Sequence, residues 1–237
     1  MAADYIDFIS SYCDRWCERC AFTGRCSAFA AEAAIAMCGD VQEGLELAVG
    51  SPAQVPYGPS RPADSDWLAD FEGADSSPEA TRAFEQEERE RRARVDDDAI
   101  VKAAWVVSML AYQWLKANDD RLRAAADPVL DEALTVATHD AFLVTVKLTR
   151  AVDGRDRFER GEDRDEGAVQ NDWNGSAKVA LICLERSAEA WRVVADAAGD
   201  GASLEIAEQM EALARDVEES FPQARHFVRP GFDEMGV

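Results

Sequence analysis

Residues 99–115 read AIVKAAWVVSMLAYQWL, a stretch in which Lys102 is the one charged residue. A segment this apolar is either a membrane-spanning helix or a helix buried in a protein core. It falls short of the ~18 to 20 uninterrupted apolar residues of a spanning helix, and the acidic run DDD at 96–98 precedes it. We therefore predict a core helix that runs to about Ala117 and whose N-terminus is capped by the DDD run.

Apolar residues recur at helical spacing on both sides of this segment. The other helices predicted from this periodicity cover residues 3–20, 27–38, 78–95, 128–152, 176–197 and 203–221. The sequence contains no long strand-like alternation and no internal repeat. The predicted fold class is all-α, a helical bundle of five to seven helices with an N-terminal cysteine-rich helix-turn.

The chain has 237 residues, of which 47% are hydrophobic, which is enough for one sizeable core. We predict a single helical domain over 1–237. Its expected parts are a four-cysteine cofactor-binding segment (1–38), a long surface loop (40–77), a helical bundle core (78–220) and an extended C-terminal tail (221–237). The loop is expected because residues 50–66 are rich in Pro, Gly, Ser and Asp, with one apolar anchor, WLADF, at 67–71. The tail is expected because Pro222 cannot continue the last helix.

The charge of the chain limits its partners. Asp and Glu number 47 against 25 Lys and Arg, a formal net charge of -22 that repels phosphate backbones and anionic lipids. We therefore expect neither nucleic acid nor membrane as a partner. Residues 1–16 lack the basic segment and the apolar run of a signal peptide, which predicts a cytoplasmic protein. In that reducing compartment, clustered cysteines are more often metal or redox ligands than structural disulfides.

Four of the six cysteines lie within CDRWCERCAFTGRC, residues 13–26. On a continuous helix Cys13, Cys17 and Cys20 would share one narrow face, since they are spaced i, i+4 and i+7. Cys26 would join them if the chain turned at Thr23 and Gly24. The predicted cofactor ligands, and the predicted metal ligands, are therefore Cys13, Cys17, Cys20 and Cys26.

The spacing of the cysteines along the chain indicates the size of the centre that they could bind. Zinc holds its sulfurs only about 3.8 Å apart, whereas a [4Fe-4S] cluster spreads its cysteine sulfurs to roughly 6 to 7 Å. Four helical residues rise about 6 Å, which matches the larger centre, but seven rise about 10.5 Å, so the helix must bend or end near Cys17 to Cys20 in either case. The spacing favours a [4Fe-4S] cluster. Structural zinc is the alternative, and free or disulfide-forming thiols stay open as a third.

Two family resemblances involve these cysteines. The spacing Cys13-x3-Cys17-x2-Cys20 is similar to that of the radical S-adenosylmethionine enzymes, but Arg19 stands where that motif usually has an aromatic residue. The chain also lacks their β/α alternation, so we do not assign it to that family. Cys17-x2-Cys20-x5-Cys26 resembles the end of the iron-sulfur loop of helix-hairpin-helix DNA glycosylases, with Phe29 as the following aromatic residue. That resemblance covers residues 17–26 and implies a cluster, not DNA repair.

The remaining candidate residues carry weaker signals. Cys38 and Cys183 lie among apolar helix residues, which predicts core packing for both. The two histidines, His139 and His226, do not follow a Glu by three residues, so the sequence lacks a carboxylate-bridged di-iron motif. Asp140 with Lys147 is predicted to form a structural or surface pair. The residues left for an unusual second site are Glu32, Glu132, His139, Glu185 and Glu189.

The leading functional hypothesis is a cytoplasmic iron-sulfur protein that transfers electrons to a protein redox partner or senses oxidants. The second is a protein-interaction module in which a four-cysteine zinc site holds the N-terminal turn and the acidic surface or the 40–77 loop meets a partner. The third is a bundle enzyme using His139 with nearby carboxylates.

Overall fold

The computed structural model describes residues 4–49, 77–161 and 167–233. Every regular element in these ranges is a helix and none is a strand, so the chain is all-α as predicted. The α-helices are α1 (Ser27–Cys38), α2 (Val41–Val49), α4 (Pro78–Asp97), α5 (Ala99–Arg123), α6 (Pro128–Glu159), α7 (Asp172–Ala198) and α8 (Gly201–Ser220). Three 3-10 helices add to them: η1 (Cys17–Arg19), η2 (Thr23–Arg25) and η3 (Ala224–His226).

The chain folds as two compact units. The first contains the residues up to Ser10 together with Cys17–Glu90, and the second contains Ser11–Trp16 together with Arg91–Val237. A short N-terminal segment, Ser11–Trp16, therefore belongs to the second unit although its neighbours on both sides belong to the first. The single domain over 1–237 stays a prediction.

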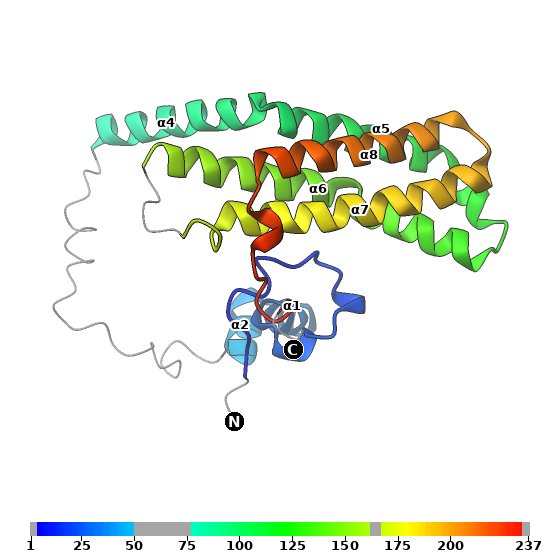
Figure 1. Cartoon of the computed structure of the whole chain (residues 1–237). Helices are drawn as coiled ribbons and strands as arrows, with labels where there is room; N and C mark the ends of the chain where they lie inside the picture. Colours follow the sequence, from blue (N-terminus) through cyan, green and yellow to red (C-terminus); the bar gives the residue numbers. More distant parts are fainter. Residues whose placement is uncertain (1–3, 50–76, 162–166, 234–237) are drawn as a thin grey trace. The chain divides into compact units, whose positions relative to one another are not determined.

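The second unit contains a four-helix bundle. Helices α5 and α7 each pack against both α6 and α8, so the four helices form a closed ring in which each contacts its neighbours along the chain (Figure 1). Residues 124–127 connect α5 to α6, and residues 199–200 connect α7 to α8. Connections this short make the joined helices antiparallel neighbours. The predicted helical bundle is confirmed.

Polar side chains fix where each bundle helix begins. Asp98 accepts a hydrogen bond from the Ile100 amide at 2.8 Å, which confirms the cap predicted from the DDD run. Equivalent caps are supplied by Asp127, Asn171 and Asp200 to α6, α7 and α8. Each cap satisfies an amide that would otherwise lack a partner at a helix N-terminus, which stabilises the helix by about 1 kcal/mol.

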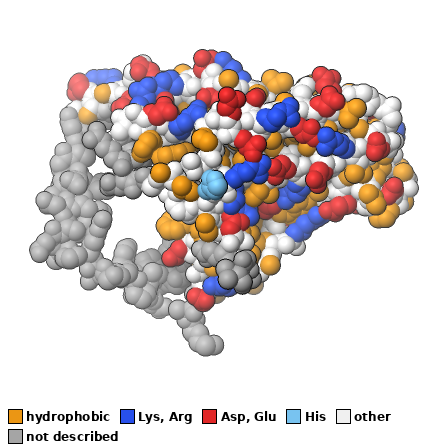
Figure 2. Space-filling model, viewed as in Figure 1, with side chains coloured by type: hydrophobic (Ala, Val, Ile, Leu, Met, Phe, Trp, Pro, Cys, Tyr) orange, Lys and Arg blue, Asp and Glu red, His pale blue; other side chains and the backbone are white. Residues whose placement is uncertain are grey.

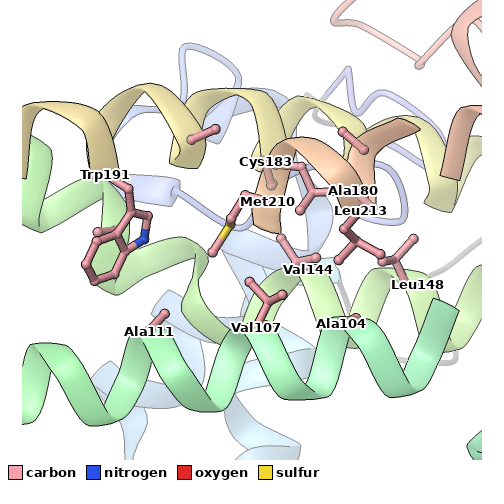
Figure 3. Packing of buried hydrophobic residues seen from close by; sticks show 14 of the residues in the cluster. Ala104, Val107, Ala111, Val144, Leu148, Ala180, Cys183, Trp191, Met210 and Leu213 are labelled. Atoms are coloured by element: carbon pink, nitrogen blue, oxygen red, sulfur yellow. The ribbon is translucent and has the colours of Figure 1, made fainter. Parts of the chain in front are cut away.

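The bundle core alternates small and large side chains. Alanines of α5 and α7 let the helices approach closely, and Leu, Val, Met and Trp side chains fill the space between them (Figure 3). Trp191 is fully buried and meets Trp114 edge to face, with ring centroids 5.2 Å apart. Cys183 is also fully buried, as predicted, and burial raises the pKa of its thiol. None of the helices among the described residues is both long enough and apolar enough to cross a membrane.

The N-terminal helix predicted over 3–20 is wrong for the part that is described. Residues 4–20 form turns, an irregular stretch and the single 3-10 turn η1. Phe8 and Arg15 have φ angles of 60° and 58°, left-handed values that an α-helix cannot contain. The Asp14 carboxylate accepts the Trp16 amide at 3.2 Å, a local bond that competes with helical hydrogen bonding.

The predicted 40–77 loop contains a helix, α2, at Val41–Val49. Gly44 lies where α2 crosses α1, because a Cβ atom there would come within 2.5 Å of the Ile35 Cα. The absent side chain of this glycine lets the two helices meet. The rest of the predicted loop, 50–76 with the WLADF anchor, lies outside the described residues. Cys38, at the end of α1, is only half-buried, so its predicted core position is wrong.

The C-terminal tail begins where predicted, since α8 ends at Ser220 before Pro222. It contains the turn η3 as well as extended residues, and Phe221, Ala224 and Phe227 are buried. Lys178 of α7 ties it down by donating to the Phe227 carbonyl at 2.6 Å and to Asp233 at 2.7 Å. Residues 234–237 lie outside the described residues.

Candidate functional site

The four predicted ligands occupy different local structures. Cys17 opens η1, Cys20 follows it, and Cys26 is the N-cap of α1, all within the first unit. Cys13 lies in the Ser11–Trp16 segment of the second unit. All four are half-buried free cysteines. Cys26 is therefore the residue that caps α1.

Two of these sulfurs accept backbone hydrogen bonds. The Phe22 amide points at the Cys20 Sγ at 3.4 Å, and the Phe29 amide points at the Cys26 Sγ at 3.5 Å. Amide donors directed at sulfur favour the thiolate, the form that binds metals, and in iron-sulfur proteins they help to set the reduction potential. The Cys20 amide also donates to the Cys17 carbonyl at 3.2 Å, which closes a tight turn between these two cysteines.

The sulfurs are not assembled into a site. Among the described residues, which include all six cysteines, no group of three or more Cys, His, Asp or Glu side chains is arranged to hold a metal ion. The shared face expected for Cys13, Cys17 and Cys20 depended on an α-helix that does not form. The donor chemistry of the segment suits a thiolate-bound centre.

Residues Ser11–Trp16, which we call the anchor segment, are held on α6 and α7 by polar contacts. Lys147 of α6 donates to the Ser11 carbonyl at 3.0 Å, and Tyr12 donates to Asp172 at the start of α7 at 3.1 Å. Tyr12 also packs on Phe227 of the tail, with ring centroids 4.6 Å apart. The anchor segment has no regular structure of its own, so these contacts position it.

Arg186 of α7 is at the centre of this anchoring. It forms a two-pronged ion pair with Asp140 of α6, at 3.0 and 2.6 Å, and a third bond at 2.7 Å to Asp14 of the anchor segment. Its guanidinium also lies over the Trp16 ring, 4.9 Å from the centroid. One arginine thus joins α6, α7 and the anchor segment.

Burial and charge act in opposite directions on the two carboxyls. Burial raises the pKa of Asp140, which is fully buried, and the paired hydrogen bonds from Arg186 offset part of this rise. Burial also raises the pKa of Asp14, but there the bonds from Arg186 and from the Trp16 amide outweigh it, and the net pKa lies below the usual value. The same two partners raise the pKa of Arg186, so it stays charged.

Lys147 is the other buried charge in this region. Only 6% of the residue is exposed, and burial lowers the pKa of its amine. The predicted Asp140–Lys147 pair is therefore wrong in its partners, because Asp140 binds Arg186 and Lys147 binds a backbone carbonyl.

His139 is engaged in the same packing. Its Nε2 lies 2.9 Å from the Asp14 carbonyl oxygen, and its ring stacks on Trp16 with centroids 4.3 Å apart. Of the glutamates predicted beside it, Glu185 pairs with Arg225 and Glu189 is exposed on α7. In the part of the chain that is described, His139 forms no metal-holding group with these residues or with Glu32 and Glu132.

Sequence analysis missed Asp14, Arg186 and Gly175. Gly175 belongs to α7, which starts at Asp172, four residues before the start at Ser176 predicted from the sequence. A Cβ atom at Gly175 would lie 2.4 Å from Tyr12 and 2.7 Å from Phe227, so the glycine makes room for both rings. No signal in the sequence indicated this close approach, because Gly175 lies before the helix start predicted at Ser176.

Comparison of the chain with known protein families, with curated protein sequences and with solved structures finds no match.

Proposed function

We propose that residues 13–26 bind a [4Fe-4S] cluster through Cys13, Cys17, Cys20 and Cys26, and that the protein transfers electrons or senses oxidants in the reducing cytoplasm. A protein redox partner would then exchange electrons with the cluster. The proposal is supported chiefly by four free thiols within fourteen residues, two of which already accept backbone amides. Such donors stabilise the thiolate form that a cluster requires.

The chain's own residues would contribute in distinct ways. Lys147 places a positive charge near Cys13, which would help to offset the negative charge of a thiolate-bound centre. The irregular backbone over 13–26 can change conformation without breaking an α-helix, and metal sites commonly become ordered as the metal binds. The anchor segment would keep Cys13 on the bundle while this happens, since Ser11, Tyr12 and Asp14 are each bonded to α6 or α7.

A structural zinc site in a protein-interaction module is the second candidate, and one observation favours it. The η1 turn from Cys17 to Cys20 is tighter than a helical step, and zinc requires closer sulfurs than a cluster does. In that case the metal would order the N-terminal segment without electron chemistry.

Metal and sulfide analysis of protein purified without oxygen tests both candidates. The first predicts a brown protein that contains iron and inorganic sulfide in equal amounts, and loses both when any one of the four cysteines is replaced by Ser. Cys38→Ser is the matched control, because Cys38 is a half-buried free cysteine outside 13–26, and it is expected to retain the cluster. A colourless protein with zinc would support the second candidate. Failure to retain either metal after reconstitution would contradict both.

A further inference from the structure

Cys17 and Cys20 lie at the two ends of one short turn. Cys17 is the first residue of the 3-10 helix η1, and the amide of Cys20, three residues later, donates to its carbonyl at 3.2 Å. Three residues complete a turn of a 3-10 helix, so side chains at positions i and i+3 lie one above the other. The backbone of η1 therefore brings these two thiols to the same side of the turn.

The length of this turn matches the span of a disulfide bond. Three residues of a 3-10 helix rise about 6 Å, and the Cα atoms of disulfide-bonded cysteines lie about 4.4 to 6.8 Å apart. The neighbouring cysteines are placed differently. Cys13 belongs to the anchor segment in the second unit, and Cys26 follows the separate turn η2. Of the six cysteines, Cys17 and Cys20 are therefore the two that share a turn.

The two thiols differ in their surroundings. Both are free and half-buried, so a small oxidant can reach them. The Phe22 amide points at the Cys20 Sγ at 3.4 Å, and a donor directed at sulfur favours the thiolate, which is the nucleophilic form. Cys20 is therefore the attacking sulfur and Cys17 the second thiol. Cys26 also accepts an amide, that of Phe29, but its nearest cysteines in the sequence are six residues before it and twelve after it.

The charge of the chain favours one class of oxidant. Acidic side chains are spread over the face seen in Figure 2, and the formal net charge of -22 repels anions at long range. Oxidised glutathione carries carboxylates and approaches against this repulsion. Hydrogen peroxide is small and uncharged, so its approach to the half-buried thiols meets no such barrier.

We propose that Cys17 and Cys20 form a reversible disulfide when hydrogen peroxide oxidises the metal-free protein. The Cys20 thiolate attacks one peroxide oxygen, the O–O bond breaks, and the departing hydroxide takes up a proton to become water. Cys17 then attacks the sulfur of the resulting Cys20 sulfenic acid, so that the S–S bond forms and hydroxide leaves as water with the Cys17 proton. In total, two thiols lose two electrons and two protons, and one peroxide becomes two waters.

The bond is reversible because a dithiol reductant can open it by thiol–disulfide exchange. Disulfides that are accessible to solvent are the labile and regulatory ones, whereas structural disulfides resist reduction. The η1 turn would thus register exposure to peroxide and return to its reduced state afterwards. This inference does not depend on the cofactor proposal, because the bond forms between two free thiols and a chain that binds no metal can still form it.

Peptide mass spectrometry of the full chain tests the pairing. The protein is reduced, freed of metal with a chelator, treated with hydrogen peroxide, alkylated and digested with trypsin without reductant. Cleavage after Arg15, Arg19 and Arg25 places the four clustered cysteines on four separate peptides. We expect peptides 16–19 and 20–25 to be joined, with a mass two hydrogens below their sum, and to separate when dithiothreitol is added. The peptides with Cys13 and Cys26 are expected to be alkylated.

Three serine variants test the order of attack. Cys17→Ser should leave a sulfenic acid on Cys20 that dimedone traps, whereas Cys20→Ser should lose both the disulfide and the dimedone adduct. Cys26→Ser is the matched control and should keep the joined peptides, since serine also caps helices and preserves the start of α1. Peptides that stay separate after peroxide treatment overturn the proposal, as does a bond that joins either one to Cys13 or Cys26. Equal dimedone labelling of Cys17→Ser and Cys20→Ser overturns the assigned roles.

Discussion

Arg186 is the side chain on which attachment of the anchor segment most depends. It binds fully buried Asp140 with two hydrogen bonds and Asp14 with a third. Buried ion pairs add little stability compared with well-packed apolar residues, but removing one partner leaves an uncompensated charge in the interior. The main role of Arg186 is therefore to determine that the anchor segment packs against α6 and α7, and its contribution to the free energy of unfolding is secondary.

Replacing Arg186 with Met should lower the free energy of unfolding by about 3 kcal/mol, because the Asp140 carboxylate is left buried without a counter-charge. Adding Asp140→Leu should recover much of this loss. Urea denaturation of the single and double variants measures both effects. Arg192→Met is the control, since Arg192 also lies on α7 but its ion pair with Glu211 is about half exposed and is expected to contribute no more than about 1 kcal/mol. Equal losses for Arg186→Met and Arg192→Met would contradict this role.

This network also shows what residue spacing can predict. Helical periodicity placed Asp140 and Lys147 on one face of α6, which is correct, but their partners come from α7 and from the anchor segment. Spacing within one helix carries no information about which side chain a neighbouring helix will supply. The four-cysteine cofactor site remains a prediction for the same reason, since the distances between its sulfurs depend on the backbone that joins them.

Helix α7 packs against two irregular segments, the anchor segment and the C-terminal tail, at Gly175. Replacing Gly175 with Ala raises helix propensity by about 1 kcal/mol, but its Cβ would meet the rings of Tyr12 and Phe227. We expect these rings to be displaced, so that hydrogen exchange speeds up over residues 11–16 and 224–228. Gly154→Ala is the matched control in α6, because its Cβ would make an ordinary 3.4 Å contact with Trp173. Unchanged exchange in Gly175→Ala would show that the glycine is not required.

The C-terminal tail should be sensitive to acid. Burial works to raise the pKa of Asp233, but hydrogen bonds from Arg229 and Lys178 outweigh it and hold the pKa below its usual value. A carboxyl with a lowered folded-state pKa contributes stability above the unfolded-state pKa and loses it as the pH falls through the folded-state value. We therefore expect the tail to loosen below about pH 4, where carboxyls in the unfolded chain are protonated.

Limited proteolysis of residues 222–233 with an acid-active protease can follow this loosening. Asp233→Asn should make the tail accessible already at neutral pH and remove most of its further change with acid. Glu219→Gln, an exposed residue near the end of α8, should leave the pH profile as it is in the wild type. A tail that stays protected throughout in Asp233→Asn would argue against the anchoring by Lys178 and Arg229.

For the whole molecule, the fold class followed from periodicity because five long segments carry strong helical patterns and polar caps. The same argument failed over 3–20, where apolar residues recur at helical spacing although Phe8 and Arg15 adopt left-handed backbone angles. Contacts with α6 and α7, from distant parts of the chain, determine the structure of the anchor segment there. The error over 41–49 went in the other direction, because a loop was predicted from the composition of residues 50–66 and extended back over a segment that forms α2.

The anchor segment also sets an order of events during synthesis. Asp14 leaves the ribosome early, but its partner Arg186 is 172 residues further along the chain. Helices α5 and α6 can pair as they emerge, because their contacts are local. Until α7 has been translated, the anchor segment lacks the arginine that binds Asp14, so it cannot yet take its place beside α6 and α7.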